Sequence, residues 1–197
     1  GATLEANYKT RKETEKPNTA AAQVFGINPE NEDAVTGLGS LISEGKYLTP
    51  GDYDQAIIGQ FLLSQYVPVE DPNFAALYNV DVGTKIRIKI DSLMREVTIK
   101  GIIKSKVDSL TRNVFMVDSQ FRSMIGRNDG NVDQIAILLE KGSDPISVRD
   151  ELKLRGIDKT AKVQTFEDAQ PKFLQDIINT FNMLGTALSS IGLVVAS

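Results

Sequence analysis

The strongest constraint in the sequence is a seam of apolar side chains near its C-terminus. Their spacing alternates between three and four residues, which is typical of a helix that packs along its length against another helix. The seam consists of Leu174, Ile177, Phe181, Leu184, Leu188, Ile191 and Val195. We therefore predict a helix over residues 169–197 with Asp168 as its N-cap, about 40 Å long at about 1.5 Å per residue.

The last part of this predicted helix is uncharged and rich in small residues. No residue after Asp176 carries a side-chain charge. Gly192 and Ala196 have the small-xxx-small spacing that lets helices approach closely in lipid. We interpret residues 169–197 as a stalk helix that leads into a truncated transmembrane helix. The alternative is an ordinary buried C-terminal helix.

The composition removes several classes of function. The 197 residues include neither cysteine nor histidine, so thiolate metal sites, disulfides and histidine-activated nucleophiles are unavailable. The chain has 26 acidic and 22 basic side chains and a net charge of −4, which argues against nucleic-acid binding. The chain begins at Gly1 without a methionine, and we expect a fragment of a longer protein.

The N-terminal part of the chain predicts strands separated by loops. Apolar and polar residues alternate over residues 2–8, which is the pattern of a half-buried strand. A second strand is predicted over residues 19–27, after a charged loop at 12–18. A short helix is expected over residues 32–43, and a buried strand at 56–58 that runs into an apolar helix.

The middle of the chain predicts a small β-rich unit, and a strand, helix, strand unit follows it. Residues 119–125 predict one or two helical turns between them. The strands of the β-rich unit are expected near residues 84–91, 95–104 and 112–118. The later unit is expected to have strands at 134–140 and 161–166 around a helix at 145–155.

No catalytic or metal site is predicted. Asp52 and Asp54 flank Tyr53, and a second acidic cluster follows Pro29 at residues 30–33. Carboxylates of this kind bind divalent cations, but neither cluster has EF-hand spacing, and both occur in turn-like sequence where acidic residues are common. We therefore predict no enzyme activity, no cofactor and no metal, with a hydrolase left open as a remote alternative.

Short pieces in order along the chain resemble the extracytoplasmic domain of the MacB/FtsX-like permease family of ABC transporters, which includes the lipoprotein-releasing permeases. Each piece is brief, but their order is specific. They are VFGINPENE (24–32), ISEGKYL (42–48), AIIG (56–59), VGTKIRI (82–88), VTIKGII (97–103), NVFM (113–116), QIAILLE (134–140), VRDELK (148–153) and VQTFED (163–168).

The resemblance implies an α+β fold, in which a porter-like α/β layer holds an inserted small β-rich subdomain and continues into a long C-terminal stalk helix. The α/β layer is expected from residues 1–50 and 130–168, the inserted subdomain from 51–129, and the stalk from 169–197. The chain departs from the family pattern at Lys46, at Thr84 and in a longer stretch over residues 67–81.

The function implied by the resemblance is mechanical. The domain would transmit ATP-driven motion from the membrane to a substrate or partner, in export or lipoprotein release. The family implies a separate ATPase, a second permease copy in a dimer, flanking membrane helices and a position outside the cell membrane. An extracytoplasmic partner or lipid-like substrate is left open. The alternative is a free-standing soluble α/β module that binds a ligand or peptide.

Overall fold

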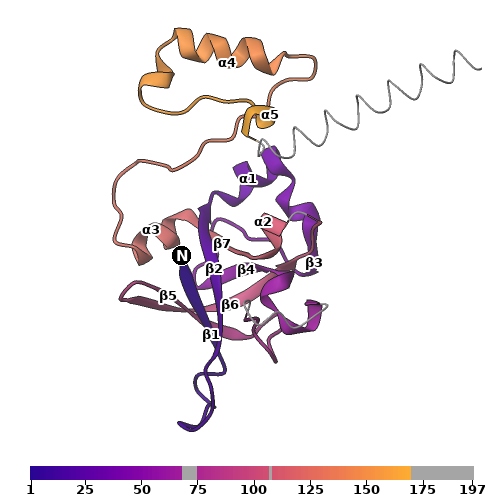
Figure 1. Ribbon diagram of the computed structural model, residues 1–197, viewed down its shortest axis with the longest axis vertical. Coiled ribbons are helices and arrows are strands. Elements are labelled where there is room, and N and C mark those ends of the chain that lie inside the picture. Colours follow the sequence, from indigo (N-terminus) through magenta and orange to yellow (C-terminus); the bar gives the residue numbers. More distant parts are fainter. Residues whose placement is uncertain (68–74, 107, 170–197) are drawn as a thin grey trace, which may run out of the picture. The chain divides into compact units, whose positions relative to one another are not determined.

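The computed structural model describes residues 1–67, 75–106 and 108–169 (Figure 1). The chain divides into two units, Gly1–Ile137 and Leu138–Ser197. From residue 170 onward the predicted stalk helix lies outside the described residues, so its seam stays a prediction.

The first unit is built on one seven-stranded sheet. The strands are β1 (Ala2–Ala6), β2 (Asn18–Ile27), β3 (Ile42–Gly45), β4 (Gln55–Gly59), β5 (Lys85–Ile90), β6 (Leu93–Ile103) and β7 (Asn113–Val117). Their order is β3-β6-β4-β7-β2-β1-β5, and β5 pairs with β6 as well. That last pairing closes six of the strands into a ring, and β3 is added to the outside of β6. Pairs β2–β7 and β4–β6 are parallel, and the others are antiparallel.

The alternation at the N-terminus is confirmed. Ala2, Leu4 and Ala6 of β1 are buried, whereas Thr3 is exposed. The strand stops two residues earlier than predicted because Asn7 adopts a left-handed backbone conformation, with φ of 56°, which turns the chain out of the ladder.

Two apolar clusters lie on opposite faces of the sheet. The larger one fills the ring and includes Leu4, Ile58, Ile86, Ile88, Val97, Ile99 and Met116. The smaller one consists of Ile27, Leu38, Leu48, Ile57, Ile103 and Phe115, with Tyr47 packed against it. Neighbouring residues of β4 supply the two clusters in turn, so both of its faces are buried, as its apolar sequence requires.

The helix predicted over residues 32–43 is shorter and lies earlier. α1 (Pro29–Thr36) begins after Asn28, whose side chain accepts a hydrogen bond from the Asn31 backbone N–H. Gly37 ends it in the left-handed conformation, at φ of 67°. A single 3-10 turn, η1 (Leu38–Leu41), follows before β3. The predicted helix therefore extended past Gly37, the residue at which α1 ends.

The apolar helix predicted after residue 58 is also absent from this stretch, which forms two 3-10 turns, η2 (Gln60–Leu62) and η3 (Ser64–Tyr66). The backbone here pairs with a later segment. Leu77 donates to the carbonyl of Leu62 at 2.8 Å, and Ser64 donates to the carbonyl of Leu77 at 2.8 Å. This tertiary pairing replaces the local hydrogen bonds that a helix would need.

The strands near residues 84–91, 95–104 and 112–118 are confirmed as β5, β6 and β7, and the turns at 119–125 as α3 (Asp118–Met124). A further short helix, α2 (Asp108–Thr111), precedes β7. These three strands share one sheet with β1 to β4. The subdomain boundaries predicted near residues 50 and 130 stay predictions.

The second unit contains α4 (Pro145–Leu154), η4 (Ile157–Lys159) and α5 (Phe166–Ala169). The helix at 145–155 is confirmed, and Asp144 caps it by accepting from the backbone N–H groups of Ile146 and Ser147. The strands predicted on either side of it are wrong, because residues 134–140 and 161–165 are outside any strand. An alternating pattern reports one apolar face, but a strand also needs a neighbour for its backbone groups.

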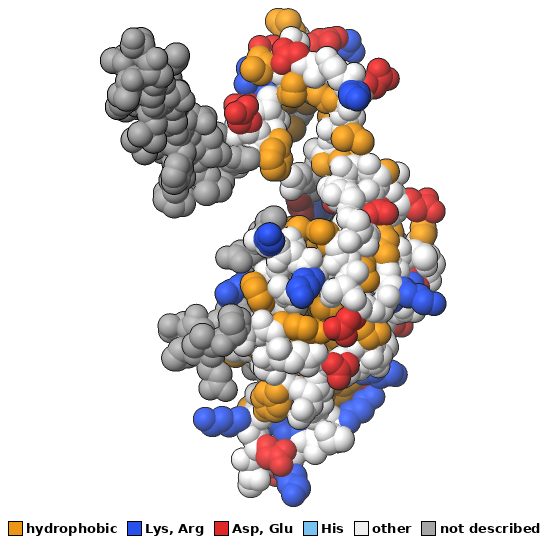
Figure 2. Space-filling view, turned by 90° about the vertical axis from the view of Figure 1, so that its right-hand side faces the viewer, with side chains coloured by type: hydrophobic (Ala, Val, Ile, Leu, Met, Phe, Trp, Pro, Cys, Tyr) orange, Lys and Arg blue, Asp and Glu red, His pale blue; other side chains and the backbone are white. Residues whose placement is uncertain are grey.

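None of the described residues of the second unit is buried. Ile146 is 53% exposed, Leu154 88% and Phe166 84%, and Figure 2 shows apolar side chains at the surface of this unit. Arg149, Val148 and Leu152 are half-buried and lie on one side of α4. Among its described residues, polar contacts and no buried core hold this unit together.

Candidate functional site

Two clusters of polar contacts are the candidates for a functional site. One lies at the end of the first unit, just before the chain passes into the second. The other lies in the second unit, at the first turn of α5, from which the chain continues into the predicted stalk.

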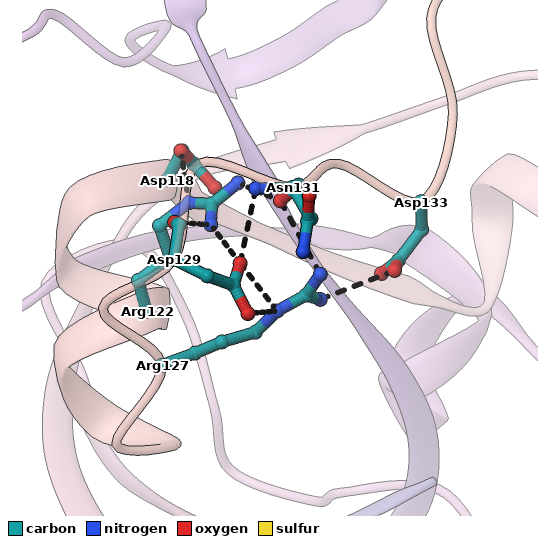
Figure 3. Close-up of polar contacts among 6 residues, drawn as sticks. All are labelled: Asp118, Arg122, Arg127, Asp129, Asn131 and Asp133. Atoms are coloured by element: carbon teal, nitrogen blue, oxygen red, sulfur yellow. Dashed lines mark hydrogen bonds and ion pairs between the residues drawn. The ribbon is translucent and has the colours of Figure 1, made fainter. Parts of the chain in front are cut away.

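The first cluster, which we call the arginine clamp, consists of Asp118, Arg122, Arg127, Asp129, Asn131 and Asp133 (Figure 3). It forms because of the way α3 ends. Gly126 adopts φ of 69°, a conformation that glycine reaches at little cost, and the chain reverses there. The backbone N–H of Arg127 then donates to the carbonyl of Arg122 at 2.9 Å. The reversal brings the two guanidinium groups to the same short loop.

Arg122 makes most of the clamp. Its Nε donates to Asp118 Oδ2 at 2.8 Å, within α3. One Nη donates to the carbonyl of Asp129 at 2.8 Å and the other to the carbonyl of Asn131 at 2.6 Å. Its side chain is only 18% exposed. A planar guanidinium with several fixed acceptors is well suited to hold a loop in one position.

Arg127 closes the clamp from the other side. It donates through Nε to both carboxylate oxygens of Asp129, at 3.2 and 3.3 Å, and through Nη1 to Asp133 Oδ1 at 3.1 Å. Burial would raise the pKa of Asp129, but hydrogen bonds from the Asn131 backbone and from Arg127 outweigh it, so the pKa is lowered. The pKa of Arg127 is raised by its contacts with Asp133 and Asp129.

The clamp is attached to the sheet through α3. A Cβ atom added at Gly26 of β2 would lie 2.9 Å from the Phe121 side chain, so only glycine lets α3 lie this close to the strand. Phe121 packs against the apolar cluster inside the ring. The loop at 129–133 is therefore fixed, through Arg122 and α3, to the closed ring of six strands, which we call the barrel.

The second cluster consists of Arg149 and Asp168, which we call the helix-start pair, together with Thr165. Asp168 Oδ2 accepts from the backbone N–H of Thr165 at 3.1 Å, and the Thr165 hydroxyl accepts from the backbone N–H of Asp168 at 3.0 Å. This reciprocal arrangement is a capping box. Asp168 was predicted as the N-cap itself; that assignment is wrong, because Thr165 caps the helix and Asp168 lies three residues further on.

Arg149 ties this capped turn to α4. Its Nη1 donates to Asp168 Oδ2 at 2.9 Å, and its Nε donates to Asp150 Oδ1 at 2.9 Å. The hydrogen bonds from Arg149 and from the Thr165 backbone lower the pKa of Asp168 to about 2. The pKa of Arg149 is raised by its bonds to Asp150 and Asp168. The first turn of α5 is therefore held from two directions.

The acidic clusters noted in the sequence have other roles. Asp52 pairs with Lys100 and accepts from the backbone N–H of Thr49 at 2.6 Å. Asp54 pairs with Arg95 at 2.8 Å, and Asp33 accepts from the backbone N–H of Gly39 at 2.6 Å. Across the part of the chain that the structure describes, no three His, Cys, Asp or Glu side chains group as metal ligands.

An open hollow of about 780 Å³ lies over the start of β1 and the middle of β2. Its lining includes Ala21, Ala22, Lys89 and Asp91. Small-molecule sites are usually enclosed and apolar with a few convergent polar groups. This hollow lacks those features and gives no specific support to the ligand-binding alternative.

Seven predicted packing residues fall beyond residue 169, and they lie outside the described residues. They are Leu174, Ile177, Phe181, Leu184, Leu188, Ile191 and Val195. The structure reaches only the first turn before them. In residues 1–67, 75–106 and 108–169, no helix has both the length and the apolar character needed to cross a bilayer.

The chain belongs to the family of MacB-like periplasmic core domains, whose family model matches residues 2–154. It is similar to the solved periplasmic region of MacB from Actinobacillus actinomycetemcomitans, with 14% identity and a TM-score of 0.46. That alignment covers 80% of this chain and 66% of the other. No curated protein matches the chain.

Family membership confirms the resemblance seen in the sequence. A MacB-like periplasmic core domain is the extracytoplasmic domain of an ABC transporter permease, and such transporters work with an ATPase. Domains of this kind are generally non-catalytic.

Proposed function

We propose that this domain transmits ATP-driven motion from the membrane to a substrate or partner outside the cell membrane, in export or lipoprotein release. It is joined to the membrane by flanking helices and works in a complex with a separate ATPase and a second permease copy. The predicted α/β layer, inserted subdomain and stalk helix remain part of this proposal.

The observation that carries the proposal is the helix-start pair. A helix transmits displacement only if its end is fixed to the body it moves. The first turn of α5 is both capped by Thr165 and bonded through Asp168 to Arg149 on α4. Because the chain runs from this turn directly into the predicted stalk, movement of the stalk would displace α4 and not merely bend the connection.

The arginine clamp would pass this displacement on from the second unit to the first. Residues 129–133 precede the passage of the chain into the second unit, and Arg122 binds two of their carbonyl groups. Displacement that reaches this loop would therefore pass through α3 to the barrel.

The position outside the membrane can be tested by labelling. The chain has no cysteine, so Ser143→Cys introduces a single thiol into a loop of the second unit. In intact cells that express the full permease, a membrane-impermeant maleimide should label this thiol. Labelling that requires permeabilised cells would contradict the proposed position.

The mechanical role can be tested at the predicted seam. Leu184→Asp and Leu188→Asp place a charge in the packing face and should let the full transporter hydrolyse ATP while transport falls. Thr186→Asp places the same charge off the seam and is the matched control. Transport that survives both seam substitutions would overturn the mechanical role.

A further inference from the structure

One end of the barrel presents an aromatic and cationic surface. We call it the hairpin-end surface and define it by Tyr8, Lys9, Tyr78, Lys85 and Arg87. The guanidinium of Arg87 lies over the Tyr8 ring, 3.7 Å from its centroid. Lys9 and Lys85 both reach Glu96, at 2.9 and 3.2 Å. These contacts draw together the β1–β2 loop and strands β5 and β6.

Hydrogen bonds fix this surface in place. Tyr8 donates its hydroxyl to Glu96, which also holds the two lysines. Asn18, which is 2% exposed, accepts from the backbone N–H of Tyr78 at 3.1 Å and donates to its carbonyl at 2.8 Å. The Tyr78 side chain itself is 47% exposed. Because Glu96 holds the side chains of Tyr8, Lys9 and Lys85, these three lose little conformational entropy when a partner binds.

Arg87 is the cation best placed to bind a partner. It forms no ion pair with any other residue that the structure describes. One face of its guanidinium is stacked on Tyr8. Glu5 and Glu96 lie opposite Arg87 in the neighbouring strands, but neither forms an ion pair with it, so the edge N–H groups of its guanidinium are available to a partner's carboxylate.

The charge of the chain is divided unevenly. Residues 5–16 together with Lys85, Arg87 and Glu96 include six basic and four acidic side chains, which leaves 16 basic and 22 acidic of the totals of 22 and 26 for the rest of the chain. In Figure 2, several Lys and Arg side chains lie at the lower end of the first unit, where Figure 1 places the β1–β2 loop. The hairpin end is positive on an otherwise acidic chain.

We propose that the hairpin-end surface binds an acidic segment of another extracytoplasmic protein, with a carboxylate at Arg87 and an apolar side chain against Tyr78. The extracytoplasmic setting rests on the proposed function, but the binding chemistry does not. Tyr and Arg are the residues most often found at the centres of protein interfaces.

The pattern of charges favours a protein over a uniform polyanion or an anionic membrane. Glu5, Glu13 and Glu15 are interspersed among the cations. These carboxylates would repel a continuous row of phosphates, whereas a folded or peptide partner can match a surface of mixed sign.

The test uses the 197-residue chain and a fluorescein-labelled peptide of alternating Glu and Leu residues, followed by fluorescence anisotropy. Arg87→Gln and Tyr78→Ser should each weaken binding about tenfold, as removal of a central interface residue commonly does. Lys104→Gln removes one positive charge beyond the far end of β6 and should change binding less than about twofold. Arg87→Lys keeps the charge but not the planar fork and should weaken binding to an intermediate extent.

Several outcomes would overturn the proposal. These are no binding of the peptide, an equal loss in Lys104→Gln, or tighter binding to phosphatidylglycerol vesicles than to the peptide. Thermal melts of each variant check that it is folded. Because peptide binding is measured on this chain in solution, its failure is distinguishable from failure of the mechanical role, which is measured by transport in the full complex.

Discussion

Arg149 on α4 donates to Asp168 on α5, with Nη1 and Oδ2 2.9 Å apart. The same carboxylate oxygen accepts from the backbone N–H of Thr165 at 3.1 Å. One oxygen thus joins the cap of α5 to the body of α4. In a unit with no buried residue among those described, this contact determines how firmly the start of the predicted stalk is held.

Loss of Arg149 should loosen the first turn of α5. In Arg149→Gln, Asp168 keeps its bond to Thr165 but loses the tie to α4, so the backbone amides of residues 167–169 should exchange with deuterium faster. Arg155→Gln is the control, because Arg155 forms an exposed pair with Glu151 and does not touch α5. Equal exchange in the two variants would show that Arg149 does not hold this turn.

The titration of Asp168 should report the same contact. Its pKa is lowered from 3.8 to about 2, so the contact stabilises the folded state above the ordinary pKa and this contribution is lost as pH falls through about 2. NMR titration of the Asp168 carboxyl should give a midpoint near 2 in the wild type. In Arg149→Gln the midpoint should move toward 3.8; an unchanged midpoint would contradict this cause.

The arginine clamp should open when Arg122 is shortened. Arg122→Gln removes charged hydrogen bonds to the carbonyls of Asp129 and Asn131, worth about 2 kcal/mol, or roughly 30-fold in the opening equilibrium. The Asn131 backbone N–H, which donates to Asp129 Oδ1 at 3.0 Å, should exchange faster by about that factor. Exchange at Asn131 that stays at the wild-type rate would show that Arg122 is dispensable for the loop.

Asn18 should be a structural residue of the barrel. Its buried amide bonds both the N–H and the carbonyl of Tyr78, so Asn18→Ala leaves two backbone groups without these partners and should lower the free energy of unfolding by about 2 kcal/mol. Asn7→Gly removes a weaker, exposed bond to the same carbonyl, at 3.3 Å, keeps the backbone turn, and should change it by about 0.5 kcal/mol or less. Urea unfolding of both variants makes the comparison.

Gly59 should not tolerate a methyl group. A Cβ atom there would lie 2.2 Å from the backbone carbon of Thr111, so Gly59→Ala has to push α2 away from β4. We expect a loss of about 1–3 kcal/mol. Gly51 has nothing within 4 Å of such an atom, and Gly51→Ala should change stability by less than about 0.5 kcal/mol. Similar losses in the two variants would contradict the close approach.

The sequence predicted where the strands of the first unit lie, but it did not predict which strands pair with one another. The alternation of Ala2, Leu4 and Ala6 predicted β1 because burial of one face is local information. The pairing of Glu5 with Arg87 in the β1–β5 ladder joins residues far apart in the chain, and nothing in either segment specifies it. That pairing closes the ring of strands, which the local patterns of the two segments did not predict.

The candidate site was visible in part. Thr165-Phe166-Glu167-Asp168 has the spacing of a capping box, and this signal would have placed the helix start correctly, three residues before the predicted cap at Asp168. The arginine clamp had no comparable signal, because it depends on the reversal of the chain at Gly126. The family resemblance, by contrast, rested on many short pieces in order and is confirmed.

The central claim is that this domain moves when the transporter hydrolyses ATP. With a spin label at Ser143→Cys in both copies of an otherwise cysteine-free full transporter, double electron–electron resonance measures the distance between the two second units. The account predicts that this distance distribution shifts between the nucleotide-free state and the state trapped with ATP and vanadate. The double variant Leu184→Asp, Leu188→Asp should abolish the shift while ATP hydrolysis continues. An identical distribution in the two states of the wild type would contradict it.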